Sequence, residues 1–313
     1  MIRYLVRRLF FALFLVFAVS SSSLILTRLA PGDFVVETLG VGVSRDVAEQ
    51  ARIRYGLDQP IATQYGRWLL QAARFDFGRS LAYDRPVADL VPERAFNTAL
   101  LALSALLLAT LVGLPLGVVT GTRGGLATSV IRAASVVLVS MPPLLTSLLL
   151  VFAAARTGWL PIGGMRSVTS DGALLDLVRH MIVPVLALAL PIGAMFERLQ
   201  AQAMRQAVSQ PFVIATRARG VSRRRIIWRD ALKVGLRPIA SVYGLVIGTL
   251  LSGSFAVEIV TAWPGLGRLM LDALRARDVY LVAACAAAGS IFLAAGTLLS
   301  DAALVAVDPR FSE

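Results

Sequence analysis

The chain has 313 residues, of which 57% are hydrophobic and 16% are charged, and its formal net charge is +12. A soluble domain usually carries about 45–50% apolar and about 25% charged residues, so this apolar excess must be buried against something other than water, and lipid is the obvious candidate. The positive charge indicates either nucleic acid or an anionic membrane surface as a partner. The single cysteine (Cys285), the single histidine (His180) and the single lysine (Lys233, which follows a leucine) exclude an internal disulfide, a Cys-cluster metal site, most histidine-based chemistry and a G-x-x-x-x-G-K-[ST] phosphate-binding loop.

Six uncharged apolar runs are long enough, or nearly so, to cross about 30 Å of hydrocarbon as helices, which takes roughly 17–25 residues each. Backbone amides left unpaired in lipid would cost several kcal/mol each, so closed helices are expected. The fourth run contains Pro184 and Pro191, and we expect it at the centre of the bundle because protein neighbours tolerate such prolines better than lipid does. The sequence thus predicts an all-α polytopic membrane protein with six transmembrane helices at residues 9–26, 98–122, 133–155, 181–196, 239–257 and 279–300.

The positions of Lys and Arg predict the orientation of these spans. An even number of spans places both termini on one side of the membrane. With cytoplasmic termini, the inner segments hold 16 basic residues and the outer segments hold 6, once the long outer loop at residues 27–97 is set aside because long segments cross largely regardless of charge. A basic cluster on one membrane face argues against nucleic acid. A cleaved signal peptide ending near Ala18-Val19-Ser20 is the alternative for the N-terminus, but the apolar run continues to Leu26.

The first predicted region, residues 1–96, joins the first span to a small helical extracytoplasmic segment. Ser44 is expected to cap a short helix that ends at Gly56. A second helix over residues 65–75 is expected to bury one apolar face. That face is made of Tyr65, Trp68, Leu69 and Ala72.

Residues 97–305 form the predicted five-helix core, and residues 306–313 form a cytoplasmic tail. Within the core, residues 156–180 lack a strong period, so an irregular loop is expected there. His180 stands at the end of this loop, where we interpret it as a solvated interfacial residue rather than a ligand.

The basic segment between the fourth and fifth spans, residues 198–238, is the most informative part of the chain. The fourth helix is expected to continue to Ser209, where Gln210-Pro211 breaks it. A two-turn helix over residues 212–219 then ends at Gly220.

A third helix, over residues 223–236, is expected to follow with Ser222 as its cap. Anchoring by anionic lipid would account for the arginines of this segment, at about 1 kcal/mol each. It would not account for a short helix with a defined end. That helix also carries three apolar residues expected to be exposed, Phe212, Val213 and Ile214. These features favour a docking surface for a cytoplasmic partner.

Several motifs occur in an order that resembles one transporter family. Residues 212–222 read FVIATRARGVS, which is similar to the cytoplasmic EAA loop of ABC importer permeases, and above all to the loop of the dipeptide, oligopeptide and nickel permeases. The resemblance covers the whole chain. Its other motifs are Leu29-Ala30-Pro31-Gly32-Asp33, Gly56-Leu57-Asp58-Gln59-Pro60, Gln64-Tyr65, Phe75-Asp76-Phe77-Gly78-Arg79-Ser80, Trp263-Pro264-Gly265-Leu266-Gly267-Arg268, Ala276-Arg277-Asp278 and Asp308-Pro309-Arg310.

This resemblance implies a type I ABC importer permease, one of two different permease subunits that form a heterodimeric pathway in a bacterial inner membrane. Two ATPase subunits would bind ATP and Mg and dock on the short inner helices, and an extracytoplasmic binding protein would deliver a peptide or peptide-like solute. This chain would hold no catalytic residue, cofactor or metal, in agreement with the missing phosphate loop. The docking role carries over to Phe212, Ala215, Thr216, Arg217, Ala218, Arg219 and Gly220, whereas Ile214 stands where the motif has its glutamate.

The translocation pathway is expected along the small and proline-bearing faces of the middle spans, because small residues let helices approach closely and slide; ordinary helix packing is the alternative interpretation. Glu258, at the outer end of the fifth span, either pairs with Arg268 or contacts a cationic amine of the solute, and we favour the pair. The pathway candidates are Pro142, Pro143, Pro191, Gly248, Ser252 and Glu258, with Pro184, Gly244 and Gly253 on the same faces.

Two other classes of function fit the sequence less well. An intramembrane enzyme could use Ser252-Gly253-Ser254, but His180 lies at the far end of another span and Lys233 lies in the inner segment. An ion-coupled secondary transporter would need an ionisable residue at mid-membrane, and no predicted span has one in its interior. The solute stays open, because dipeptides, oligopeptides, glutathione and nickel chelates all fit this scaffold.

Overall fold

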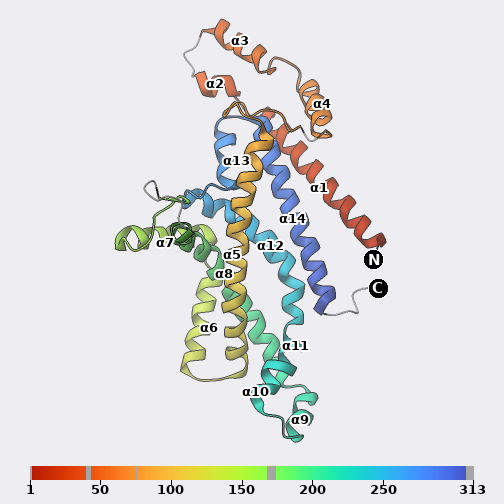
Figure 1. Ribbon diagram of the computed structural model, residues 1–313, viewed down its shortest axis with the longest axis vertical. Coiled ribbons are helices and arrows are strands. Elements are labelled where there is room, and N and C mark those ends of the chain that lie inside the picture. The colour runs from red at the N-terminus through yellow and green to blue at the C-terminus, as the bar shows by residue number, and fades with distance from the viewer. Residues whose placement is uncertain (1, 40–43, 75, 168–173, 308–313) are drawn as a thin grey trace. The chain divides into compact units, whose positions relative to one another are not determined.

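The structure is a computed structural model that describes residues 2–39, 44–74, 76–167 and 174–307. Within these ranges the chain is helical, and its β-pairing is confined to one isolated bridge between Arg79 and Pro86 (Figure 1). It divides into two compact units. The core unit comprises residues 99–263 and 295–307, and the flanking unit comprises residues 2–98 and 264–294.

The flanking unit begins with α1 (Ile2–Leu29), α2 (Phe34–Leu39), α3 (Arg45–Arg54) and α4 (Ile61–Ala72). It also holds the start of α5 (Val87–Thr122), all of α13 (Leu266–Arg275) and the start of α14 (Val279–Val307). The two predicted helices of the outer segment are confirmed as α3 and α4, although Phe75 lies outside the described residues. Ser44 precedes α3 but makes no side-chain cap, and α2 was not predicted.

The predicted apolar face of α4 packs as expected. Trp68 is buried against Leu24 of α1 and Ala283 of α14. Tyr65, Leu69 and Ala72, the other members of that face, contact the same cluster, and the Tyr65 hydroxyl lies 2.9 Å from Ser21 Oγ. The period of the apolar residues was therefore enough to find this packing face.

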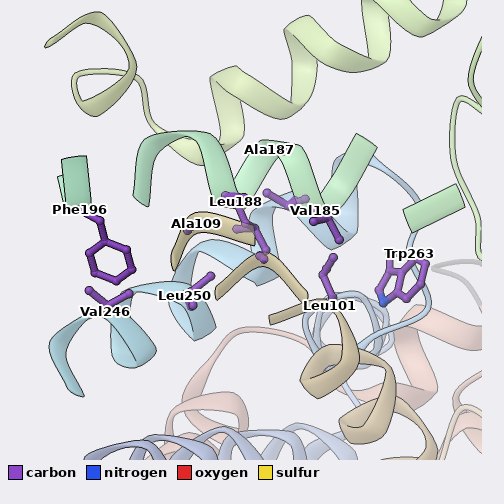
Figure 2. Packing of buried hydrophobic residues seen from close by; sticks show 12 residues of the cluster. Leu101, Ala109, Val185, Ala187, Leu188, Phe196, Val246, Leu250 and Trp263 are labelled. Carbon is purple, nitrogen blue, oxygen red and sulfur yellow. The ribbon is translucent and has the colours of Figure 1, made fainter. Parts of the chain in front are cut away.

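The core unit is built around α8 (Leu174–Val208). This helix packs against α6 (Leu126–Val139), α7 (Pro143–Thr157), α11 (Leu232–Gly235) and α12 (Arg237–Val260). Figure 2 shows the apolar cluster at its centre, which includes Leu188 and Phe196 of α8, Leu101 of α5 and Leu250 of α12. The central position predicted for the fourth span is confirmed.

Among the described residues, five helices are long and apolar enough to cross a membrane. The third predicted span is not one of them, because α6 and α7 are separated by a break and bent by 108°. The bend falls at Met141-Pro142-Pro143, where neither proline has a backbone N–H to continue the ladder of α6. Counted as one broken span, the pair brings the total to six, so the predicted architecture is confirmed while the continuous helix at residues 133–155 is wrong.

Three glycines bring α5 and α8 unusually close. A Cβ on Gly113 would lie 2.4 Å from the carbonyl oxygen of Gly193, and one on Gly117 would lie 2.6 Å from that of Glu197. One turn further along α5, a Cβ on Gly121 would lie 2.6 Å from the Ala201 carbonyl oxygen. Small residues at every fourth position let helix backbones approach in this way.

His180 corrects one expectation. It lies inside α8, whose described part begins at Leu174, and it is buried rather than solvated. Its Nδ1 lies 2.8 Å from the Asp176 carbonyl oxygen and 3.5 Å from the Asp176 carboxylate. The expected loop at residues 156–180 is therefore shorter than predicted at both ends, and residues 168–173 lie outside the described part of the chain.

Candidate functional site

The segment between the fourth and fifth spans holds the candidate docking helix. Helix α8 ends at Val208, and α9 (Pro211–Ala218) follows with its proline at the first position, where the missing N–H removes no helical hydrogen bond. Gly220 has a φ of +80°, a left-handed conformation that favours glycine, and its N–H donates to the Arg217 carbonyl oxygen at 3.0 Å. The break, the two-turn helix and its glycine stop are confirmed.

One side of α9 is exposed, and the other side packs against the rest of the core unit. Ile214 is 69% exposed, and Ala215, Arg217, Ala218, Arg219 and Gly220 are exposed as well. Phe212 and Val213 are half-buried, which corrects the expectation that both are exposed, because this side of α9 packs on the helical turns that follow. Thr216 is buried, and its hydroxyl accepts a hydrogen bond from Arg219 Nη2 at 3.2 Å.

The predicted third helix is formed in three pieces: α10 (Arg223–Arg225), a π-helical stretch η1 (Ile226–Ala231) and α11. Ser222 stands at the N-cap, but its side chain makes no cap hydrogen bond. The helix propensity of residues 223–236 predicts a helix but not its π-helical stretch. Both α9 and α8 pack on that stretch, η1.

This α10–η1–α11 segment anchors α9 to the spans of the core unit. Ala231 of η1 packs with Val118 of α5 and Met204 of α8. A Cβ on Gly235 of α11 would lie 2.8 Å from Met204 Sδ, so a larger residue there would displace the Met204 side chain. Arg223 Nη2 donates to the Thr122 carbonyl oxygen, at the end of α5, at 3.1 Å. A force applied to α9 would therefore reach α5 and α8 through packed side chains.

A buried polar cluster lies beside this anchor and was missed by the sequence reasoning. It consists of Thr120, Glu197 and Gln200, all buried. The Thr120 hydroxyl donates to Glu197 Oε1, and Arg132 of α6 donates to the Thr120 carbonyl oxygen. Among the described residues, Glu197 Oε2 and both polar atoms of the Gln200 side chain have no hydrogen-bond partner.

Glu197 is the sequence feature that could have indicated this cluster, but it lies just outside the predicted fourth span. Glu197 follows the predicted fourth span by one residue, so it was counted with the inner segment, whereas α8 continues as one helix to Val208. Glu197 lies on the same helix face as Gly193, which is four residues earlier and packs closely against α5. This shared face indicates a buried position, but a search for uncharged runs excludes any residue that carries a charge.

The pathway candidates are spread over several helices. Pro142 is exposed at the bend, and Pro143 starts α7 and approaches Gly253 of α12, where a Cβ would lie 3.3 Å from its ring. Pro191 and Gly248 are half-buried in α8 and α12, and only the backbone of Ser252 is described. Their contact with a solute stays a prediction.

Glu258 is 0% exposed near the C-terminal end of α12. Its carbonyl oxygen accepts a hydrogen bond from the Trp263 amide at 2.9 Å. Full burial favours a structural role for this carboxylate over direct contact with a solute.

In the part of the chain that the structure describes, five or six apolar spans and a short exposed helix anchored between two of them form the architecture of a transporter's membrane subunit. Two family models cover it: "Binding-protein-dependent transport system inner membrane component" matches residues 113–313, and "Binding-prot-dependent transport system membrane comp, N-term" matches residues 1–102. The chain belongs to this family and is a multi-pass inner-membrane permease subunit of an ABC importer.

Relatives match along nearly their whole length. The oligopeptide transport system permease protein AppB of Bacillus subtilis (strain 168) is 29% identical, over 99% of each chain. A putative peptide transport system permease protein of Brucella abortus (strain 2308) is 31% identical over 91% of each chain. The glutathione transport system permease protein GsiC of Escherichia coli (strain K12) is 29% identical over 99% of this chain and 98% of its own. The resemblance inferred from the motifs is thereby confirmed.

Proposed function

We propose that this chain forms half of the translocation pathway of an ATP-driven importer of peptides or peptide-like solutes. A second, homologous permease subunit supplies the other half, two ATPase subunits bind ATP and Mg, and an extracytoplasmic binding protein delivers the solute. The names of the relatives support the solute class, with glutathione as a peptide-like member of it. A nickel chelate is the alternative solute.

The observation that carries the proposal is the anchored, half-exposed helix α9. Its exposed side offers one large apolar side chain, Ile214, flanked by the cationic Arg217 and Arg219. An apolar anchor with arginines around it is the composition of an interface centre rather than of an ordinary solvated surface. The partner that this surface fits is the ATPase, and the contacts through η1 and α11 carry its movement into α5 and α8.

The membrane orientation is part of the same proposal, with both termini and α9 in the cytoplasm. Single cysteines at Ala218 and at Asp84 report the two faces, because the native Cys285 is buried within α14 and gives little background. In sealed, right-side-out vesicles, a membrane-impermeant maleimide is expected to label Asp84→Cys and not Ala218→Cys. The opposite labelling would contradict the proposed orientation.

Co-purification tests the docking role. The chain is co-expressed with the ATPase and second permease subunits proposed above, and the ATPase retained per permease chain is measured. Ile214→Asp places a charge at the centre of the exposed side of α9 and is expected to reduce retention about tenfold or more, as the loss of an interface anchor does. Val47→Asp, which adds the same charge at an exposed position of α3, is the control. Equal retention in both variants would reject docking on α9.

A further inference from the structure

Three arginines line one cavity of the core unit. The cavity has a volume of about 430 Å³ and lies along α6 and α8. Arg132 enters it from α6, and Arg198 and Arg205 enter from α8, where a spacing of seven residues places them two turns apart on one face. Arg132 also donates to the carbonyl oxygens of Thr120 and Arg123, and the five N–H groups of each guanidinium leave further donors for an anionic group such as a phosphate.

The same cavity has one carboxylate in its wall. Glu197 is 1% exposed, its Oε1 accepts the hydrogen bond from Thr120, and its Oε2 has no hydrogen-bond partner among the described residues. Leaving a buried carboxylate oxygen unpaired is costly, so Glu197 is the residue of the cavity that gains most from a donor brought by a ligand. A primary ammonium group supplies such a donor together with the opposite charge.

An apolar groove adjoins the cavity and shares Glu197 with it. The groove has a volume of about 360 Å³ and lies between α5, α6 and α8. Along α8 it is lined from Leu186 to Glu197, whereas the cavity is lined from Met195 to Arg205. The arginines therefore lie toward the C-terminal end of α8, and the apolar wall lies toward the middle of the span.

We propose that the cavity and the groove together bind one ethanolamine phospholipid of the cytoplasmic leaflet. Its phosphate lies among Arg132, Arg198 and Arg205, its primary ammonium donates to Glu197, and one acyl chain runs along the apolar groove. Basic pockets between spans on the cytoplasmic side are known positions for lipid headgroups. The order along α8 fits the depth of such a lipid, with the headgroup at the membrane surface and the chain toward the bilayer centre. The proposal rests on the orientation given under the proposed function.

Retained lipid measures this binding directly. The importer complex is reconstituted in bilayers with equal parts of phosphatidylethanolamine, phosphatidylglycerol and phosphatidylcholine, then extracted into detergent, and the lipid kept per permease chain is quantified by mass spectrometry. The wild type is expected to keep phosphatidylethanolamine in preference to both others. The preference over phosphatidylglycerol follows from the ammonium, and that over phosphatidylcholine follows because a quaternary ammonium has no N–H to donate.

Two variants separate the two halves of the headgroup. Glu197→Gln keeps the shape but removes the charge, and is expected to reduce the preference for phosphatidylethanolamine over phosphatidylglycerol about tenfold, the loss of one charge-assisted hydrogen bond. The double substitution of Arg198 and Arg205 by Ala is expected to reduce retention of every phospholipid. It alters exposed side chains only, so it stays informative if Glu197→Gln destabilises the fold. Arg229→Ala, at an exposed arginine outside the cavity, is the control.

Three outcomes would overturn the proposal. Retention that is equal for phosphatidylethanolamine and phosphatidylglycerol in the wild type would remove the role of Glu197, and retention unchanged by the double arginine substitution would remove that of the phosphate site. Displacement of the lipid by a zwitterionic dipeptide such as dialanine would assign the cavity to the solute instead. Because lipid is counted without ATP or transport, a failure of the proposed transport function leaves this result readable.

Discussion

The Thr120 hydroxyl on α5 donates a hydrogen bond to Oε1 of Glu197 on α8, and both side chains are buried in the core unit. Arg132 on α6 donates to the carbonyl oxygen of the same threonine, so three helices are joined at one point. Next to this point, α11 approaches α8 at Gly235, whose Cβ would lie 3.1 Å from Gln200 Nε2. The polar contacts among the spans and the anchor of α9 are thus neighbours in the structure.

Replacing Thr120 by Val keeps the shape of the side chain and removes its hydroxyl. Glu197 Oε1 then loses its donor while it stays buried, which is expected to lower the free energy of unfolding by about 1–3 kcal/mol. Thr157→Val is the matched control, because the Thr157 hydroxyl donates only within its own helix and the residue is exposed. Unfolding in increasing SDS measures both variants, and equal midpoints would show that the Thr120–Glu197 bond adds nothing to stability.

Gly117→Ala is expected to force α5 and α8 apart. Its Cβ would lie 2.5 Å from Gln200 Cβ and 2.6 Å from the Glu197 carbonyl oxygen, and backbone atoms cannot move aside as the end of a flexible side chain can. Overpacking of this kind costs about 1–3 kcal/mol or more. Gly66→Ala on α4, which meets nothing within 4 Å, is expected to be stabilising by about 0.4–1 kcal/mol instead. Opposite shifts in thermal midpoint are predicted, and a destabilised Gly66→Ala would contradict the assignment of open space there.

Ser80 and Asp278 form a buried hydrogen-bonded pair in the flanking unit. Asp278 Oδ2 accepts from Ser80 Oγ at 2.6 Å and from the Ala82 amide at 3.1 Å, and Oδ1 accepts from the Leu281 amide in the first turn of α14. Asp278→Ala is expected to cost about 1–3 kcal/mol because it removes a cap and leaves buried donors unpaired.

A double-mutant cycle tests this pair. Ser80→Ala in the Asp278→Ala background is expected to cost clearly less than in the wild type, because its acceptor is already gone. Unfolding of the four proteins by SDS gives the coupling free energy. Strictly additive costs would show that the two side chains do not act together.

Asp33 predicts a pH dependence of the outer segment. Desolvation raises its pKa, but hydrogen bonds from Arg52 Nε, at 2.6 Å, and from the Val36 amide, at 3.0 Å, outweigh it, so that the pKa lies below the usual 3.8. A lowered pKa in the folded state gives stabilisation that is fully present above the unfolded value and is lost as the pH falls through the folded value.

Arg52→Ala removes the partner and should lower the thermal midpoint above about pH 5, with the difference from the wild type vanishing toward about pH 2. Arg54→Ala, an exposed arginine two residues further along the chain, is the control and should leave the midpoint unchanged at both pH values. A difference between Arg52→Ala and the wild type that persisted at the acid end would show that the Asp33 carboxylate is not its source.

Long apolar runs and their breakers made the fold predictable. Five spans, the outer helices α3 and α4, and the end of α9 at Gly220 followed from runs, periods and glycines that act over a few residues. The bend at Met141-Pro142-Pro143 was visible as two prolines but was interpreted as part of a pathway face inside a straight span. A proline predicts that the helical hydrogen bonds are interrupted. It does not predict the bend of 108°, which depends on the helices against which α7 packs.

The site was predictable only in part, because exposure is a property of the folded chain. Residues 212–219 were identified as a helix, yet which side of it packs on η1 depends on contacts that no local pattern encodes, and Phe212 and Val213 were therefore placed wrongly. In the buried cluster of Thr120, Glu197 and Gln200, the hydrogen bond between Thr120 and Glu197 joins residues that are 77 positions apart in the sequence. Such pairs become visible only once the Gly117 contact brings α5 against α8.

The central claim is that this permease has no energy source of its own and changes conformation when an ATPase bound to α9 hydrolyses ATP. Uptake of a labelled peptide into proteoliposomes that hold the whole importer, with its binding protein outside, tests the claim most directly. The account predicts uptake that requires ATP inside the vesicles, that an ion gradient alone does not drive, and that deletion of residues 211–220 abolishes. Uptake driven by an ion gradient without the ATPase, or uptake that survives the deletion, would contradict it.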